Sequence, residues 1–138
     1  MLNSIYNQRM TILNKLKRED SPNGLDAWFK TVIDNGAWYQ DIIRNVDKNG
    51  VYIGNTLKVL IPFNDSFSEY KDWKTTCEGY TISKGDYIIL GDIEETEITP
   101  NNVTKIAQKY SDNICLVKHF RINYNRFGAT VQLKIEGI

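Results

Sequence analysis

The chain has 138 residues, of which 41% are hydrophobic and 12% aromatic, which is enough for one buried core and indicates a single domain over 1–138. Its 17 basic and 17 acidic side chains cancel, so the overall charge does not direct the protein to nucleic acid, an anionic membrane or an acidic ligand. Charged side chains near the start interrupt any signal-peptide core, and no apolar run approaches the ~20 residues that span a bilayer. We therefore expect a protein that is neither exported nor membrane-embedded.

The first half of the chain has the pattern of an antiparallel meander. Strands are predicted over Tyr6–Leu16, Ala27–Ile33, Ala37–Val46 and Val51–Ile61. A charged segment that ends in Ser21-Pro22-Asn23-Gly24 predicts a long loop over about 17–26. Asn35-Gly36 is expected to reverse the chain, because this dipeptide adopts positive φ in tight turns, and Asp47–Gly50 is a second turn signal.

The alternation stops between Pro62 and Gly79, where aromatic residues are scattered among polar ones. This pattern predicts a long loop over about 62–79 with at most one helical turn. A short apolar approach over Tyr80–Ile82 then leads into the stretch from Gly85 to Ile93, whose β-branched and aromatic residues predict a central strand buried on both faces.

Thr99-Pro100 predicts the start of a short helix over about 100–110, with a hydroxyl cap followed by proline at the first helical position. An apolar stripe at helical spacing, formed by Val103, Ile106, Ala107 and Tyr110, needs a sheet to lie on. Further strands are expected over Ile114–Tyr124 and Thr130–Glu136, with a reversal at Asn125–Gly128.

These elements predict a mostly β fold. Short strands with one helix late in the chain favour a small antiparallel β-barrel or closed sandwich of about seven to eight strands, because closure removes the edges that such a set would expose.

No catalytic, cofactor-binding or metal-binding residue is predicted. His119 is the only histidine and lies mid-strand, and neither Cys77 nor Cys115 has the basic, helix-terminal context that activates a thiol. A zinc site needs about four good ligands, and the chain offers two cysteines and one histidine. The acidic cluster Asp92, Glu94, Glu95 and Glu97 precedes the helix, where carboxylates are favoured by the helix dipole, and we interpret it as structural.

A nucleic-acid-binding barrel of the oligonucleotide-binding type is an alternative from another class, because such barrels stack bases on exposed aromatic residues. The basic side chains that such a groove needs are matched by acids along the chain. We therefore assign most of the candidate aromatics to the core or to a subunit interface: Trp28, Trp38, Tyr39, Tyr52 and Tyr87.

Four stretches together resemble a family of small proteins encoded in the head-to-tail gene region of tailed phages and prophages of Gram-positive bacteria. They are Asn7–Ile12, the Trp28 to Trp38 region, Gly85–Asp92 with its acidic link and helix, and Asn123–Gly128 with Ile135-Glu136-Gly137. Members of that family carry a His-Trp pair in the final strand, where this chain has Gln132-Leu133.

The resemblance implies a non-enzymatic virion component, present in the host cytoplasm during assembly: a head-closure, or head–tail connector, subunit. It would form a ring with its own copies between the portal or adaptor and the tail, and help to retain packaged DNA, which it meets in the channel by proximity only. A tail-terminator or adaptor subunit of the same particle is the nearest alternative. In similar connectors one long loop projects into the channel, and we expect 63–76 to be that loop, with contacts made by Phe63, Phe67, Tyr70, Trp73 and Lys74.

Overall fold

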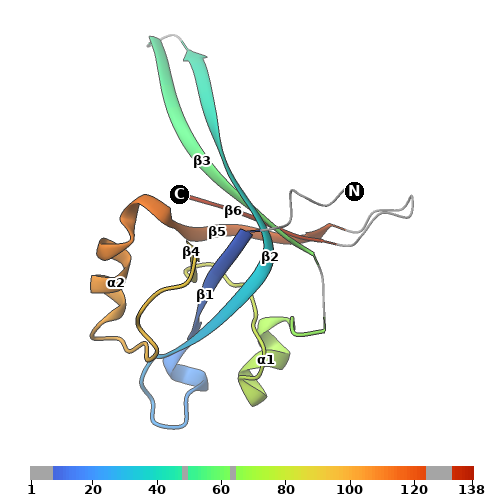
Figure 1. The fold of residues 1–138 in the computed structure, drawn as a ribbon, viewed down its shortest axis with the longest axis vertical. Helices are drawn as coiled ribbons and strands as arrows, with labels where there is room; N and C mark the ends of the chain where they lie inside the picture. Colours follow the sequence, from blue (N-terminus) through green and yellow to red (C-terminus); the bar gives the residue numbers. More distant parts are fainter. Residues whose placement is uncertain (1–7, 48–49, 63–64, 124–131) are drawn as a thin grey trace.

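The computed structural model describes residues 8–47, 50–62, 65–123 and 132–138, and for residues 39–56 and 123 it describes the backbone alone. In this part of the chain six strands and two α-helices are present (Figure 1). The strands are β1 (Gln8–Leu16), β2 (Ala27–Asp47), β3 (Gly50–Pro62), β4 (Tyr87–Leu90), β5 (Ile114–Asn123) and β6 (Gln132–Gly137). The helices are α1 (Tyr70–Thr76) and α2 (Val103–Lys109), and short 3₁₀ turns cover Arg18–Asp20 and Ser111–Asn113.

The strands form one closed antiparallel sheet in the order β1-β2-β3-β6-β5-β4, and β4 pairs with β1 to complete the ring. Closure leaves each strand with two neighbours along at least part of its length, which is how such folds avoid open edges. The expectation of a mostly β, closed antiparallel fold is confirmed. In the closed order β1 and β6 occupy opposite walls.

The predicted reversal at Asn35-Gly36 is wrong, and this lowers the strand count from the expected seven to eight. β2 continues through both residues, pairs with β1 up to Gly36, and pairs with β3 from Ala37 onward. The register with β1 shifts between Gln8 and Met10, and a Cβ built on Gly36 would collide with the Met10 side chain. The glycine therefore admits Met10 at a bulge where one long strand changes partners.

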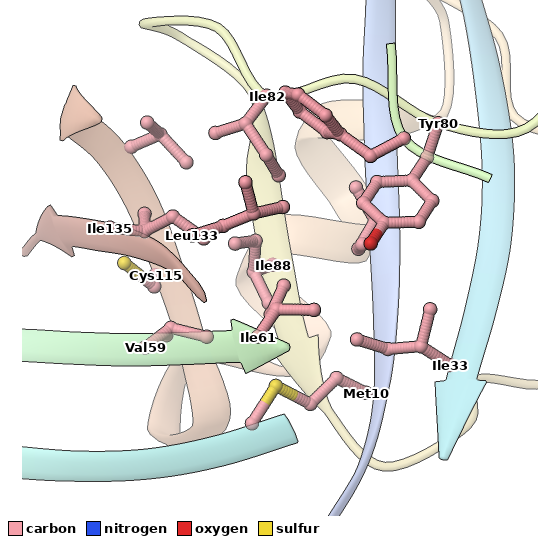
Figure 2. Close-up of a cluster of buried hydrophobic side chains, with 13 residues drawn as sticks. Met10, Ile33, Val59, Ile61, Tyr80, Ile82, Ile88, Cys115, Leu133 and Ile135 are labelled. Atoms are coloured by element: carbon pink, nitrogen blue, oxygen red, sulfur yellow. The ribbon is translucent and has the colours of Figure 1, made fainter. Parts of the chain in front are cut away.

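The interior of the closed sheet holds the main core, which draws on every strand and on the segment before β4 (Figure 2). Its fully buried members include Met10 and Ile12 from β1, Ile61 from β3 and Leu133 from β6. Because side chains alternate along a strand, the neighbours of these residues point away from the interior.

A second core lies outside the ring, between the outer face of β1 and β4 and a layer made by α2 and the link that precedes it. Its buried members are Leu13, Ile89, Ile93, Ile98, Val103 and Ile106. The predicted apolar stripe of the helix therefore does lie on a sheet. β1 is buried on both faces. The stretch from Gly85 to Ile93 was predicted to be a strand of this kind, but only Tyr87–Leu90 within it forms a strand.

Several predicted boundaries move. Gly85 and Gly91 flank β4 with φ of 96° and 92°, so the chain turns sharply at each end of this strand. α2 begins at Val103, three residues later than expected, but the predicted hydroxyl cap is present: Asn102 N donates to Thr99 Oγ1 at 3.2 Å, and Thr99 N donates to Asn102 Oδ1 at 2.7 Å. Tyr80–Ile82 forms no strand and contributes a single bridge to Phe67. The predicted reversal at 125–128 lies outside the described residues.

Candidate assembly surface

The predicted channel loop begins with a residue that is held in the core. Phe67 is buried, and its ring lies 5.9 Å from that of Tyr80 and 5.7 Å from that of Phe120. Ser68 N donates to Tyr80 O at 3.0 Å, and Tyr80 N donates to Ser66 O at 2.9 Å. Gly79 makes this approach possible, since it has a φ of 66° and a Cβ there would collide with the Ser66 carbonyl. Phe63 lies outside the described residues.

The middle of the same segment forms α1, which is attached to the body by Trp73. This indole is fully buried, with its ring 5.5 Å from Phe29 at an interplanar angle of 85° and 5.9 Å from Tyr70. A buried tryptophan with edge-to-face packing stabilises a helix far more than seven residues of helix propensity do. The segment predicted as a long loop with at most one helical turn therefore holds a seven-residue helix that is anchored to the body.

Tyr70 and Lys74 join this segment to the other long loop, over 17–26. Tyr70 Oη donates to Asp20 Oδ2 at 2.7 Å and accepts from Lys17 N at 3.1 Å, and Lys74 Nζ lies 3.3 Å from Asp20 Oδ1. The hydrogen bond from Tyr70 lowers the pKa of Asp20, while burial raises the pKa of Tyr70 to about 12. The two predicted long loops therefore contact each other.

Of the five residues predicted as contacts, Phe67 and Trp73 thus anchor the segment, and Tyr70 and Lys74 connect it to the neighbouring loop. The side of α1 that remains exposed carries Lys71, Asp72 and Thr75. That this segment contacts a partner stays a prediction. A different element reaches further from the body.

That element is the β2–β3 arm, which we define as 41–47 of β2 with 50–56 of β3. Among the described residues, the two strands of this arm pair only with each other, from Asp41 opposite Thr56 to Asp47 opposite Gly50, whereas β6 pairs with β3 only from Leu57 onward. At about 3.4 Å per residue, the arm extends roughly 20 Å beyond the last β3–β6 pair. Figure 1 shows it leaving the body at the end opposite to the 17–26 loop.

The sequence of the arm is rich in apolar residues: Ile42, Ile43, Val46, Val51, Tyr52 and Ile53. A two-stranded ribbon buries little of its surface and is marginally stable in water without a third strand or a packed neighbour. Sequence reasoning did predict the two strands and the turn at Asp47–Gly50. The arm was not predicted, because the alternation of residues within β2 and β3 does not show where the neighbouring strand β6 ends.

A buried polar cluster, also missed, fixes the chain where β1 meets the approach to β4. Asp86 accepts hydrogen bonds from Asn14 Nδ2 at 2.9 Å, Ser83 N at 3.0 Å and Lys15 N at 3.1 Å. Asn14 also exchanges two hydrogen bonds with the backbone of Thr81. Burial raises the pKa of Asp86 to about 6, against these donors, which act to lower it.

Two lysines form ion pairs with the acidic cluster that precedes α2. Lys30 Nζ donates to the carbonyls of Ile93 and Glu95 at 3.1 and 2.9 Å and lies 3.2 Å from Asp92 Oδ1. Lys109 Nζ lies 3.1 Å from Glu94 and 3.3 Å from Glu95. Within the described ranges no three His, Cys, Asp or Glu side chains gather as a metal site would require.

The remaining reactive side chains are separate from one another. His119 is exposed on β5, and Cys77 and Cys115 are both free thiols whose pKa values are raised by burial, that of Cys115 to about 11. Trp28 and Tyr87 stack on each other at 5.8 Å beside the second core, and Trp38 packs against the main core. The side chains of Tyr39 and Tyr52 are not described.

Comparison with known families gives one match, which covers residues 5–138 and is described as "Family of unknown function (DUF6751)". The chain belongs to this family. The match covers both loops, the arm and all six strands. No curated protein and no solved structure matches the chain. Within the described residues, neither α1 nor α2 has the length and apolar composition that a bilayer-spanning helix requires.

Proposed function

We propose that this protein is a structural subunit that assembles with copies of itself, and that its place is the head-closure, or head–tail connector, ring of a tailed phage or prophage. The observation that carries the assembly role is the β2–β3 arm. A ribbon of two strands that leaves a closed sheet, and that has no third strand beside it among the described residues, brings its outer edges and an apolar sequence to a neighbour.

The body of the protein suits this role because it holds the arm rigidly. β2 and β3 continue from the arm into the closed sheet, where Val59 and Ile61 are fully buried. A neighbour that pulls on the arm therefore pulls on the main core. The contact between arm and neighbour is heterologous, and heterologous contacts form closed rings when the rotation between copies closes.

The placement in a phage particle is supported by the sequence resemblance described at the outset. A connector ring receives the tail on one side and the adaptor or portal on the other, and it helps to retain packaged DNA. The partners proposed are accordingly further copies of the chain, the adaptor or portal, and the tail.

The proposal is tested by shortening the arm in the phage or prophage that encodes the protein. Residues 41–56 are replaced by Asn-Gly, which joins Gln40 to Leu57, a pair that already lies opposite in the β2–β3 ladder. We expect this variant to fold but to yield heads that lack tails and lose DNA, as seen by electron microscopy of induced lysates.

The matched control changes the exposed side of α1 by the double substitution Lys71→Ala and Asp72→Ala, and it should leave particles intact. Normal tailed, DNA-filled particles from the shortened variant would overturn the proposal. Defective particles from the α1 control alone would return the contact role to the 63–76 segment.

A further inference from the structure

The outer face of β3, β6 and β5 carries a group of basic side chains on the wall opposite β1. Val59, Ile61, Leu133 and Ile135 fill the interior, so the residues that alternate with them face outward. The resulting surface, which we call the basic face, is formed among the described side chains by Lys58, His119, Arg121 and Lys134 with one carboxylate, Glu136. The chain as a whole has equal numbers of acidic and basic residues, so this face is a local excess of positive charge.

Two of these cations lie directly opposite each other. Arg121 of β5 pairs in register with Lys134 of β6, and Lys134 is half-buried. Like charges at directly opposite positions destabilise an antiparallel pair. Among the described side chains neither Arg121 nor Lys134 has an acidic partner within ion-pair distance, whereas Lys15, Lys30, Lys74 and Lys109 all do.

The one carboxylate does not neutralise this pair. Glu136 lies one row further along β6, with Lys58 opposite on β3 and His119 opposite on β5. A shallow hollow of about 190 Å³ lies over the face, lined by His119, Phe120, Arg121, Lys134 and Glu136. An oxyanion placed there would contact Arg121 and Lys134 together and relieve their repulsion.

The composition of the face favours the phosphates of a nucleic acid over a protein surface. Interface cores between proteins are apolar and depleted of lysine, whereas the described outward positions of β3 and β6 hold two apolar residues, Leu60 and Pro62, and Phe120 is the one apolar residue that lines the hollow. Contacts to a nucleic-acid backbone come from arginine and lysine and require no apolar centre.

We propose that the basic face binds the phosphate backbone of DNA, with Arg121 and Lys134 as direct phosphate ligands. This inference rests on the proposed function and deepens it: in a connector ring, the wall formed by β3, β6 and β5 faces the channel that DNA occupies. Contact through the backbone alone makes binding independent of sequence and sensitive to salt.

The test measures fluorescence polarisation with a 20-base-pair duplex, a 20-nucleotide oligo(dT) and a polyglutamate peptide, each at several salt concentrations. We expect the purified wild-type chain to bind the duplex with a dissociation constant of about 1–100 µM at physiological salt, and more tightly at low salt. The double variant Arg121→Ala, Lys134→Ala should lose about tenfold in affinity, and its salt slope should fall by about two phosphate contacts.

The matched control, Lys71→Ala with Lys105→Ala, removes the same charge from the exposed sides of the two helices and should bind within about twofold of the wild type. A second readout is the melting temperature of the double variant without DNA, since removing both members of a like-charged pair should leave this temperature unchanged or raised.

The inference is overturned if the wild type does not bind the duplex at low salt, or if the helix control weakens binding as much as the double variant does. A strong preference for oligo(dT) would assign base stacking instead, and equal binding of polyglutamate would assign an acidic protein partner. The variant with the shortened arm should bind DNA normally, so failure of this inference and failure of the assembly proposal are distinguishable.

Discussion

Replacing Gly79 by alanine tests how firmly the 65–80 segment is attached to the body. Gly79 has a φ of 66°, and a Cβ at this position would collide with the Ser66 backbone carbonyl. Gly24 is the matched control, because it has a similar φ of 71° but nothing lies within 4 Å of an added Cβ. Both substitutions carry left-handed strain of about 1–2 kcal/mol and the same reduction in unfolded-state entropy. The difference between them therefore isolates the collision.

The magnitude of that difference follows from what must move. To accommodate the methyl group, the backbone at Ser66 has to shift away, which breaks the hydrogen bonds Tyr80 N to Ser66 O and Ser68 N to Tyr80 O. These contribute about 1 kcal/mol each. The shift also loosens the buried rings of Phe67 and Tyr80. We expect Gly79→Ala to lose about 2–4 kcal/mol more unfolding free energy than Gly24→Ala.

Urea denaturation followed by tryptophan fluorescence measures both variants. For a domain of this size, the excess corresponds to a melting temperature lower by roughly 8–14 °C. Equal destabilisation of the two variants would refute the reasoning, because it would mean that the segment moves freely relative to the main core.

Three further changes test separate parts of the structure. Trp73→Ala should cost about 3–5 kcal/mol of unfolding free energy, because it empties the site under α1. Trp73→Phe should cost clearly less, because the buried indole N–H has no acceptor among the described residues. An alanine variant as stable as the wild type would contradict this packing. Lys30→Met should cost about 2 kcal/mol and speed hydrogen exchange over 93–98, whereas Lys105→Met should do neither. The pKa of Asp86 is raised from 3.8 to about 6 on folding, so its contribution to stability is fully present only well below pH 3.8 and is lost as the pH rises through 6. The stability of the wild type relative to Asp86→Asn should fall by about 2 kcal/mol between pH 4 and pH 7, and a constant difference would refute this.

Periodicity in the sequence predicted most of the fold. Strands were predicted over Val51–Ile61 and Thr130–Glu136, and in the described parts of these stretches Val59, Ile61, Leu133 and Ile135 are fully buried in the closed sheet. The helix stripe was also predicted correctly, because a 3.6-residue period has few other interpretations. Closure of the sheet was predicted because a set of short strands would otherwise leave open edges exposed.

The errors came from places where tertiary contacts override local chemistry. Asn35-Gly36 has the composition of a turn, but the glycine is needed to admit the Met10 side chain at a bulge, and the strand continues. The aromatic residues of the predicted channel loop suggested an exposed contact surface, yet Trp73 is fully buried against Phe29. A single sequence does not show which aromatic residues a distant strand will cover.

The site was harder to predict than the fold because its elements are defined by pairing. The arm is visible only once β6 is seen to stop opposite Leu57, and the basic face only once Arg121 is seen opposite Lys134. Each of these residues is ordinary in its own strand. Which residues come together depends on the register between neighbouring strands, and the periodicity of a single strand does not predict that register.

The most direct test of the central claim is a cryo-electron microscopy structure of the assembled phage particle, with this chain located in the map. The account predicts a ring of copies between the adaptor or portal and the tail, in which each arm packs against a neighbouring copy. Absence of the chain from the particle, or a ring in which the arms extend freely into solvent, would contradict it.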